Sequence, residues 1–252
     1  MDDSRVYSRK IDINTDHTKD FYDARAKKAD SMPCPYTAVL LGDQAGDRAR
    51  QWDSFEKSFL VSEVEFGKND RVLDIGCGMG RLAETLIPLC GYYYGADFSS
   101  GMIELAEKRF ASMDYDNYEF HAASFNDIVK DPQITKDKVT KVVITGVCMY
   151  INDSDLRTCY EGLLDCVSDD CVIYIEDTVG VKDRLTLNNI VSEALQSNYD
   201  AIYRSPEEYN EFFEIFKNKG FHIVKQDFFP NFDGDSSFKE TDHWFTILTN
   251  RK

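Results

Sequence analysis

A short run of glycines follows an apolar segment of the chain. In VLDIGCGMG, residues 72–80, Gly76, Gly78 and Gly80 alternate with other residues, and the helical pattern RLAETLI follows directly. Glycines at this spacing let a ligand approach the backbone closely, at a helix start where unpaired N–H groups lie. Asp97 ends the next apolar run, 97 − 76 = 21 residues after the first glycine. A carboxylate at this position can accept hydrogen bonds from both hydroxyls of a ribose. The pattern predicts a site for a nucleoside-containing cofactor.

Two classes of cofactor use such a loop. The dinucleotide fingerprint GxGxxG favours glycine or alanine at position 81, where this chain has Arg81. Asp97 is common to both classes and does not discriminate between them. Asp74, two residues before the first glycine, does help to discriminate, and a dinucleotide remains the weaker alternative.

DIGCGMG followed by GADFSSGMIELAEK resembles the motifs of the class I S-adenosylmethionine (SAM)-dependent methyltransferases. The resemblance covers residues 71–177 and, as architecture, extends through the last two expected strands. It implies that the three glycines line the methionine moiety of SAM, that Asp74 lies near its ammonium group, and that Asp97 binds the ribose. A carboxylate near an ammonium and an acidic, aromatic setting for a sulfonium are physically sensible.

The same resemblance implies further residues of the cofactor site. Phe98 and Met102 are expected to pack on the adenine. Members of the family commonly have an acid after the third strand that binds the adenine amino group, whereas FHAASFND offers Ser124 or the backbone of Phe125 there. The set of expected cofactor-binding residues is completed by Tyr22, Thr145 and Gly146.

The chemistry of methyl transfer limits what the remaining residues must do. Because the methyl group of a sulfonium is already activated, the enzyme chiefly holds a nucleophile in line with it and excludes water. An oxygen nucleophile must also lose a proton, whereas an amine needs only to be neutral. The expected catalytic residues are Tyr150, Glu176 and His243, with Asp177 as a further candidate. Each also fits an ordinary structural role, as a half-buried tyrosine, a charge at a strand end or a structural histidine.

The elements that position these residues follow from the periodicity of the chain. From residue 71, short apolar runs such as RVLDI, KVVITG and CVIYIED alternate with helical stripes such as Leu82, Leu86 and Leu89. Strands that are apolar throughout and separated by helices predict a doubly wound, mostly parallel, seven-stranded α/β sheet of the Rossmann-like methyltransferase type, with an antiparallel last strand. Its ligand crevice lies beyond the carboxyl ends of the strands.

The remaining segments are expected to be additions to this core. Residues 1–70 are predicted to form an N-terminal helical cap, and residues 71–252 the methyltransferase core. Within the core, residues 178–205 are predicted to be a helical insertion after the fifth strand. Together with the loop at 229–242, this insertion is expected to form an aromatic lid.

Composition restricts the classes of partner. The 252 residues include 29 Lys and Arg against 45 Asp and Glu, a net charge of −16 that disfavours nucleic acid and anionic membranes. The polar start and the lack of an apolar run of about 18 residues predict a soluble, cytoplasmic protein. Seven cysteines without a CxxC pattern are expected to be reduced core residues, and four scattered histidines predict no metal site.

These observations predict a SAM-dependent methyltransferase with a small-molecule or sugar acceptor, methylated on oxygen rather than nitrogen by in-line displacement, with S-adenosylhomocysteine (SAH) as product. Neither a nucleic acid nor a membrane is expected as partner. The oligomeric state, including a homodimer, stays open. Two alternatives remain: a catalytically inactive cofactor-binding protein that acts through interactions, and an NAD-binding oxidoreductase.

Overall fold

The computed structural model describes residues 4–40, 46–192, 197–230 and 240–251. Its strands, helices and 3-10 helices (η) follow in the order β1 (Arg5–Tyr7), α1 (Thr15–Ala26), η1 (Ala29–Ser31), η2 (Pro35–Ala38), α2 (Asp47–Glu63), β2 (Arg71–Ile75), α3 (Ala83–Leu86), β3 (Tyr92–Asp97), α4 (Ser100–Phe110), β4 (Tyr118–Ala122), α5 (Phe125–Ile128), α6 (Pro132–Asp137), β5 (Val139–Thr145), η3 (Cys148–Tyr150), α7 (Asp153–Leu163), β6 (Val167–Gly180), β7 (Leu185–Ser192), β8 (Ser197–Tyr203), α8 (Pro206–Lys217), β9 (His222–Phe228) and β10 (Thr241–Thr249).

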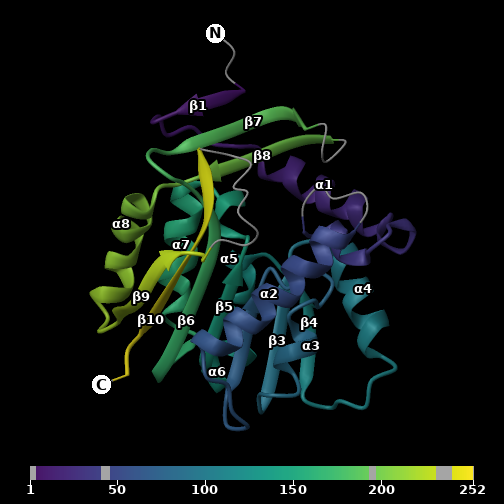
Figure 1. Cartoon of the computed structure of the whole chain (residues 1–252). Coiled ribbons are helices and arrows are strands. Elements are labelled where there is room, and N and C mark those ends of the chain that lie inside the picture. The colour runs from purple at the N-terminus through teal and green to yellow at the C-terminus, as the bar shows by residue number, and fades with distance from the viewer. Residues whose placement is uncertain (1–3, 41–45, 193–196, 231–239, 252) are drawn as a thin grey trace.

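Seven strands form the large sheet, in the order β4-β3-β2-β5-β6-β10-β9 (Figure 1). β2 pairs in parallel with β3 on one side and β5 on the other, so the strand order reverses between β2 and β5. β10 pairs antiparallel with both β6 and β9. Six strands therefore run in one direction and β10 in the other, which confirms the predicted doubly wound sheet with its antiparallel last strand.

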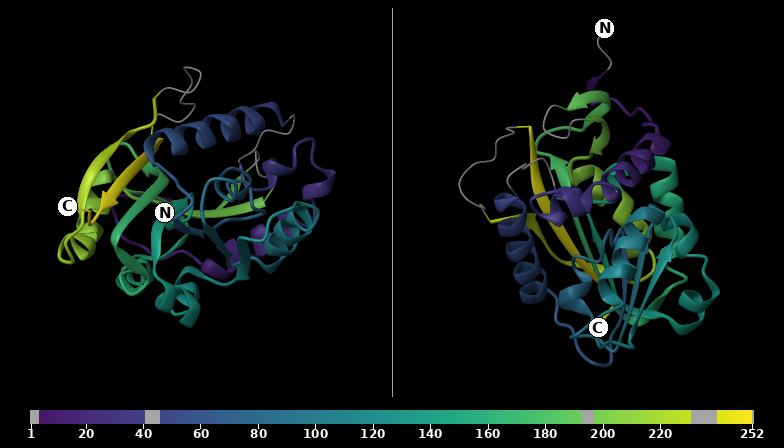
Figure 2. Two further views of the ribbon diagram at one scale, coloured as in Figure 1. Left: turned by 90° about the horizontal axis from the view of Figure 1, so that it is seen from below. Right: turned by 90° about the vertical axis from the view of Figure 1, so that its right-hand side faces the viewer.

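Alternate residues of each strand face opposite sides of this sheet. Val72 and Tyr174 pack in the cluster that contains residues of α2, α3 and α4, whereas Leu73 and Ile173 pack with α5, α7 and α8. In the view from below, α2 (blue) and α7 (teal) accordingly lie on opposite sides of the sheet (Figure 2). The alternation also decides where strand-end residues point. Glu176, two residues after Tyr174, belongs to the α2 side.

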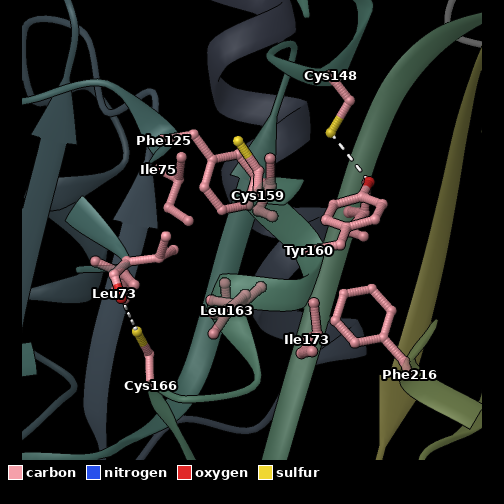
Figure 3. Close-up of a cluster of buried hydrophobic side chains, with 14 of the residues drawn as sticks. Leu73, Ile75, Phe125, Cys148, Cys159, Tyr160, Leu163, Cys166, Ile173 and Phe216 are labelled. Atoms are coloured by element: carbon pink, nitrogen blue, oxygen red, sulfur yellow. Dashed lines mark hydrogen bonds between the residues drawn. The ribbon is translucent and has the colours of Figure 1, made fainter. Parts of the chain in front are cut away.

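The cysteines lie in the core. All seven are buried and free, as the sequence predicted. In the cluster on the α7 side, the Cys148 sulfur lies 3.2 Å from the Tyr160 hydroxyl, and the Cys166 thiol donates to the carbonyl of Val129 at 3.2 Å (Figure 3). Burial raises the pKa of the Cys166 thiol to about 12. This thiol therefore stays protonated at neutral pH.

The prediction of a helical insertion at 178–205 is wrong. β7 and β8 pair antiparallel, and β1 pairs with β7, so that these strands form a separate three-stranded sheet. It lies beyond the carboxyl ends of the parallel strands (Figure 1). Leu185 and Leu187 on β7, and Tyr199 and Ala201 on β8, are buried with a period of two. Local periodicity did not indicate these strands because one partner, β1, lies at the other end of the chain.

The N-terminal segment supplies two predicted helices and one strand that was not predicted. α1 is fixed to the core where the Ser99 hydroxyl donates to Asp23 at 2.5 Å. α2 carries Trp52 and Phe59 on one face, and their rings lie 5.8 and 4.5 Å from that of Phe229. The division of the chain at residue 70 stays a prediction.

Two further expectations concern loops and membranes. Most of the loop at 229–242 lies outside the described residues, so its role as a lid remains a prediction.

Within the described ranges, no helix combines the length and the apolar character needed to cross a membrane.

Candidate functional site

A cavity of about 1360 Å³ lies at the carboxyl ends of the parallel strands. It is bordered by the glycine loop after β2, by residues that follow β3, β4 and β5, by the ends of β6 and β8, by the start of β10, and by α1 and α2. Sites for single small ligands typically enclose about 300–1,000 Å³. The cavity therefore has room for a cofactor and a second ligand. Its position matches the crevice predicted at the reversal of strand order.

The structure brings almost all predicted site residues to this cavity. Those that border it are Tyr22, Asp74, Gly76, Gly78, Asp97, Phe98, Met102, Ser124, Phe125, Thr145, Gly146, Tyr150, Glu176, Asp177 and His243. Gly80 does not border it. A Cβ at Gly80 would lie 2.9 Å from the Phe110 ring, so this glycine allows the loop to pack on α4. The expectation that Gly80 lines the cofactor stays a prediction that this position does not support.

Two glycines at the cavity lack side chains for different reasons. Gly76 has a φ of +77°, and a Cβ there would collide with the side chain of Val147. Gly146, after β5, has a φ of +65°, and a Cβ there would meet no atom within 4 Å. Because Gly146 borders the cavity, its missing side chain leaves open space for a ligand.

Asp74 and Asp97 carry the acidic groups beside the glycine loop. Asp74 accepts a hydrogen bond from the Tyr93 hydroxyl at 2.6 Å, and its Oδ1 is buried without a partner among the described residues. The two oxygens of Asp97 accept from the backbone N–H groups of Gly78 and Ser99, each at 2.9 Å. Burial raises the pKa of Asp74 to about 7 and that of Asp97 to about 6. Both carboxylates retain capacity for donors of a ligand.

The segment after β4 offers a residue that the sequence analysis missed. Ser124 is the N-cap of α5: its oxygen accepts from the Asp127 N–H at 3.2 Å and donates to the Asp127 carboxylate at 2.6 Å. Its hydroxyl proton is therefore already engaged. Asn126 also borders the cavity, and its buried Oδ1 has no partner in the described part of the chain. The sequence offered one signal for this residue: Asn126 carries a side-chain amide two residues after Ser124, the position where the adenine-binding residue was expected.

A chain of tyrosine hydroxyls joins three elements at the cavity. The Tyr22 hydroxyl of α1 donates to that of Tyr150 in η3 at 3.0 Å, and Tyr150 lies 2.8 Å from Tyr199 of β8. Burial raises the pKa of Tyr150 well above its usual value of 10. Tyr150 is therefore a neutral phenol that forms hydrogen bonds, and it is a poor proton acceptor.

A second group of side chains borders the cavity on the α2 side of the sheet. We call this group the α2-side cluster, and its members are Trp52, Glu56, Arg81, Glu176 and His243. Glu176 accepts from the Tyr174 hydroxyl at 3.0 Å. Burial, together with the nearby Glu56 carboxylate, raises its pKa well above the usual 4.5. The carboxyl of Glu176 therefore tends to be protonated.

His243 has the opposite character. Its ring lies 4.3 Å from that of Trp52, and burial lowers its pKa below 6.5, although the nearby carboxylates of Glu56 and Asp242 oppose this shift. The imidazole is therefore neutral at physiological pH and has a lone pair that can accept a proton. Among the three predicted catalytic residues, His243 has the protonation state that suits a general base.

Arg81 and Glu56 form a buried ion pair. Arg81 donates to Glu56 Oε1 at 2.8 Å and to Asp53 at 3.1 Å. Glu56 Oε2 is buried and has no partner among the described residues. The sequence analysis considered Arg81 only as a departure from the dinucleotide fingerprint, and it missed Glu56 and Trp52. Nothing in the sequence of α2 indicates which of its turns meets the cavity.

Asp177 lies on the other face of the sheet from Glu176. It accepts from the Tyr209 hydroxyl of α8 at 2.7 Å, and burial raises its pKa to about 6.

Across the described ranges, no group of three or more His, Cys, Asp or Glu side chains is arranged to hold a metal ion.

Comparison with known proteins decides the class of the chain. A family model described as a methyltransferase domain matches residues 66–244. The chain belongs to this methyltransferase family. Demethylmenaquinone methyltransferase of Symbiobacterium thermophilum is 35% identical over 72 residues, which are 27% of this chain and 28% of that protein. The chain thus matches less than a third of the length of this relative.

Solved structures show the same fold. Phosphoethanolamine N-methyltransferase 1 of Haemonchus contortus, in complex with phosphoethanolamine and SAH, has a TM-score of 0.68 at 17% identity, over 94% of this chain and 50% of that one. Magnesium protoporphyrin IX methyltransferase of Synechocystis PCC 6803, with bound SAM, has a TM-score of 0.62 at 14% identity, over 96% of this chain and all (100%) of that one.

The chain therefore contains a methyltransferase domain. The residues at the cavity fit SAM as a cofactor. The free acceptor oxygens of Asp74 and Asn126 suit an ammonium and an adenine amino group, and Gly146 leaves open space in the cavity.

Proposed function

We propose that the methyltransferase acts on a small molecule and methylates an oxygen atom. The extent of the cavity supports this proposal most strongly. The same cavity that borders the glycine loop continues to His243 on β10, and its volume of about 1360 Å³ exceeds what one ligand of ordinary size occupies. The acceptor then binds against the α2-side cluster.

In this proposal the cofactor half of the cavity binds SAM, which supplies a methyl group activated by its sulfonium. Asp74 accepts from the methionine ammonium, and Asp97 accepts from the ribose hydroxyls. Asn126 accepts from the adenine amino group, while Phe98 and Met102 pack on the adenine. The buried acceptor oxygens of Asp74 and Asn126, which lack protein partners among the described residues, support these roles.

The acceptor half positions the nucleophile. His243, neutral because of its burial, accepts the proton of the acceptor hydroxyl. Glu176 donates a hydrogen bond in its protonated form, and the rings of Trp52 and Phe229 exclude water. Tyr150 orients the acceptor or cofactor through its hydroxyl rather than as a base.

The segments outside the large sheet have a proposed role as a cap. α1 borders the cavity through Tyr22, and β8 borders it through Tyr199 and Tyr203. We infer that residues 1–70 and 178–205 together cover the core at 71–252 and shield the reaction from water.

A small acceptor is also supported by charge. The chain carries a net charge of −16, and carboxyl groups surround the cavity. Proteins bind RNA largely through contacts from Lys and Arg to its phosphates. The negative charge of this chain would therefore repel RNA unless that charge were neutralised.

The proposal is tested by methyl transfer from labelled SAM to a panel of phenols, sugars and small amines, with transfer RNA and ribosomal RNA as further acceptors. Titration of SAH by calorimetry first establishes that the purified protein binds the cofactor product. We expect methylation of a hydroxyl in the small-molecule panel and none of RNA. Methylation of RNA alone would refute the proposed acceptor class, and methylation of nitrogen alone would refute the proposed atom.

A further inference from the structure

We propose that the acceptor carries a positively charged amine and that Glu56 binds this group. This inference rests on the proposed function, because it concerns the acceptor half of the same cavity. The atom that is methylated is then a hydroxyl oxygen of the same molecule, and the amine serves only for recognition.

The first observation is a carboxylate oxygen without a partner. Glu56 is only 2% exposed and borders the cavity. Its Oε1 accepts from Arg81 at 2.8 Å, whereas its Oε2 is buried and accepts no hydrogen bond from the described residues. Leaving such an oxygen unsatisfied is unfavourable, because the group has lost its hydrogen bonds to water. A hydrogen-bond donor of a ligand in the cavity would remove this cost.

The second observation is the charge around the cavity. Its buried carboxyl-bearing side chains are Glu56, Asp74, Asp97, Glu176 and Asp177, of which Glu176 tends to be protonated and therefore adds little charge. Arg81 is the buried cation among the described lining residues, and it already donates to Glu56 and Asp53. Of the more exposed cations, Lys19 pairs with Asp23 at 2.6 Å, and Arg48 borders the cavity from α2 on the side of His243. At the buried end of this half, beside Glu56, a second ligand with a positive charge suits the lining better than a carboxylate or phosphate.

The third observation is the aromatic surface next to Glu56. Trp52 lies one helical turn before Glu56 on α2, and its ring lies 5.8 Å from Phe229 and 4.3 Å from His243. Trp52 and Phe229 border the cavity. An ammonium against the face of a tryptophan is stabilised by the negative charge of the ring face. The Glu56 carboxylate and the Trp52 indole together therefore favour a charged amine over a neutral hydroxyl as ligand.

The position of Glu56 assigns it to the acceptor rather than to SAM. Its charge raises the pKa of Glu176 at the end of β6 and opposes the lowered pKa of His243 on β10. These strands lie beyond β5, on the far side from the ribose-binding position after β3. The ammonium of SAM already has a free oxygen at Asp74 on β2. Glu56 also pairs at 2.8 Å with Arg81, the residue directly after the glycine loop, and this contact puts the proposed amine next to the methionine end of SAM.

The test uses three probes of similar shape on the wild-type protein saturated with SAH. The probes are 2-phenylethylammonium, 2-phenylethanol and 3-phenylpropanoate, each titrated by calorimetry to about 10 mM, a range that detects even weak fragments. We expect the ammonium to bind at least about tenfold more tightly than the alcohol or the carboxylate. Equal binding by either of the other probes, or no binding by the ammonium, would overturn the inference.

Glu56→Gln sharpens the test, because glutamine keeps the shape and an oxygen for Arg81 but removes the charge. We expect it to weaken the ammonium probe about tenfold, with SAH affinity changed less than twofold. Asp53→Asn is the matched control: Asp53 contacts the same arginine but does not appear among the residues that border the cavity. This control should leave ammonium binding unchanged, and thermal melting verifies that both variants fold.

Each remaining outcome has a definite meaning. Unchanged ammonium binding in Glu56→Gln, or an equal loss in Asp53→Asn, contradicts the role of Glu56. A loss of SAH affinity in Glu56→Gln alone assigns this residue to the cofactor half, and the inference fails while the methyltransferase function stands. Failure of the wild type to bind SAH would instead count against the proposed cofactor site.

Discussion

The two halves of the cavity are built in different ways. The cofactor half comes from consecutive turns after β2, β3 and β4, where glycines and backbone N–H groups define the shape. The acceptor half comes from α2, the residue after the glycine loop, β6 and β10, and depends on side chains that meet only in the folded chain. In this account, the residues that bind the cofactor lie in short sequence motifs, whereas the residues that bind the acceptor come together only through tertiary packing.

Electrostatics separates the halves as well. In the cofactor half, backbone N–H groups donate to Asp97 and a tyrosine donates to Asp74. In the acceptor half, Arg81 donates to one oxygen of Glu56, and Glu176 tends to be protonated. A change in one half should therefore affect either cofactor affinity or turnover, but not both equally.

The largest expected effect is on turnover. His243→Asn removes the proposed general base and should lower kcat by about 10²–10⁴-fold. The affinity for SAH should stay within twofold, because His243 lies in the acceptor half. Steady-state kinetics and SAH calorimetry check this prediction, with the exposed His222→Asn as control. An equal loss of SAH affinity would show that the two halves are not separate.

A change in the glycine loop should have the next largest effect. Gly78 has a φ of +54°, and a Cβ there would lie 3.1 Å from Val39. Gly78→Val should therefore weaken SAH binding about 100-fold, because strain and bulk are introduced at the loop that holds the cofactor. Gly220→Val is the control: its φ is +90°, but it lies after α8, away from the cavity. Retained SAH binding in Gly78→Val would contradict the role of the loop.

Asp97→Ala should weaken SAH binding about 10-fold to 100-fold, since hydrogen bonds to charged groups contribute about 1.5–3 kcal/mol. Part of the loss would come from the loop itself, because Asp97 also holds the N–H of Gly78. Asp97→Asn, which keeps one acceptor oxygen, should lose less. Calorimetry with SAH distinguishes these cases, and unchanged affinity in Asp97→Ala would remove this residue from the site.

The smallest predicted effect is that of pH on cofactor binding. Burial raises the pKa of Asp74 to about 7, so its carboxylate is mostly charged at pH 8 and mostly protonated at pH 6. If Asp74 binds the ammonium of SAH, affinity should fall about tenfold as the pH is lowered over this range. Asp97, with a pKa of about 6, adds to the fall near pH 6. In Asp74→Asn, affinity at pH 8 should be lower and nearly constant down to pH 7. A wild-type affinity that rises on acidification would contradict this role.

Most of the residues that the sequence assigned to the cofactor border one cavity, and the signals that identified them are local. The spacing of Gly76 and Gly78, and the acid after the next strand, depend on short-range geometry that any chain of this pattern must adopt. Gly80 packs against α4 rather than bordering the cavity, and spacing alone does not show on which side of the loop a residue packs. Asn126 was missed because Ser124 occupied the expected position and its capping of α5 was not visible.

The acceptor half and the small sheet were predicted less well for a common reason. Leu187 and Val191 have helical spacing along the chain, yet β7 is a strand because β1 and β8 supply its hydrogen bonds. Glu56 has an unremarkable place in an amphipathic helix, and only the packing of α2 on the sheet brings it to Glu176. Such long-range pairings leave no periodic signal in the sequence.

The most direct test of the two-half cavity is a crystal structure of the complex with SAH. We predict that its adenine lies at Asn126 and its ribose at Asp97, and that its ammonium lies at Asp74. The space beside Trp52, Glu56 and His243 should then remain available for the acceptor. An SAH molecule whose methionine moiety instead fills that space and contacts Glu56 would contradict the account.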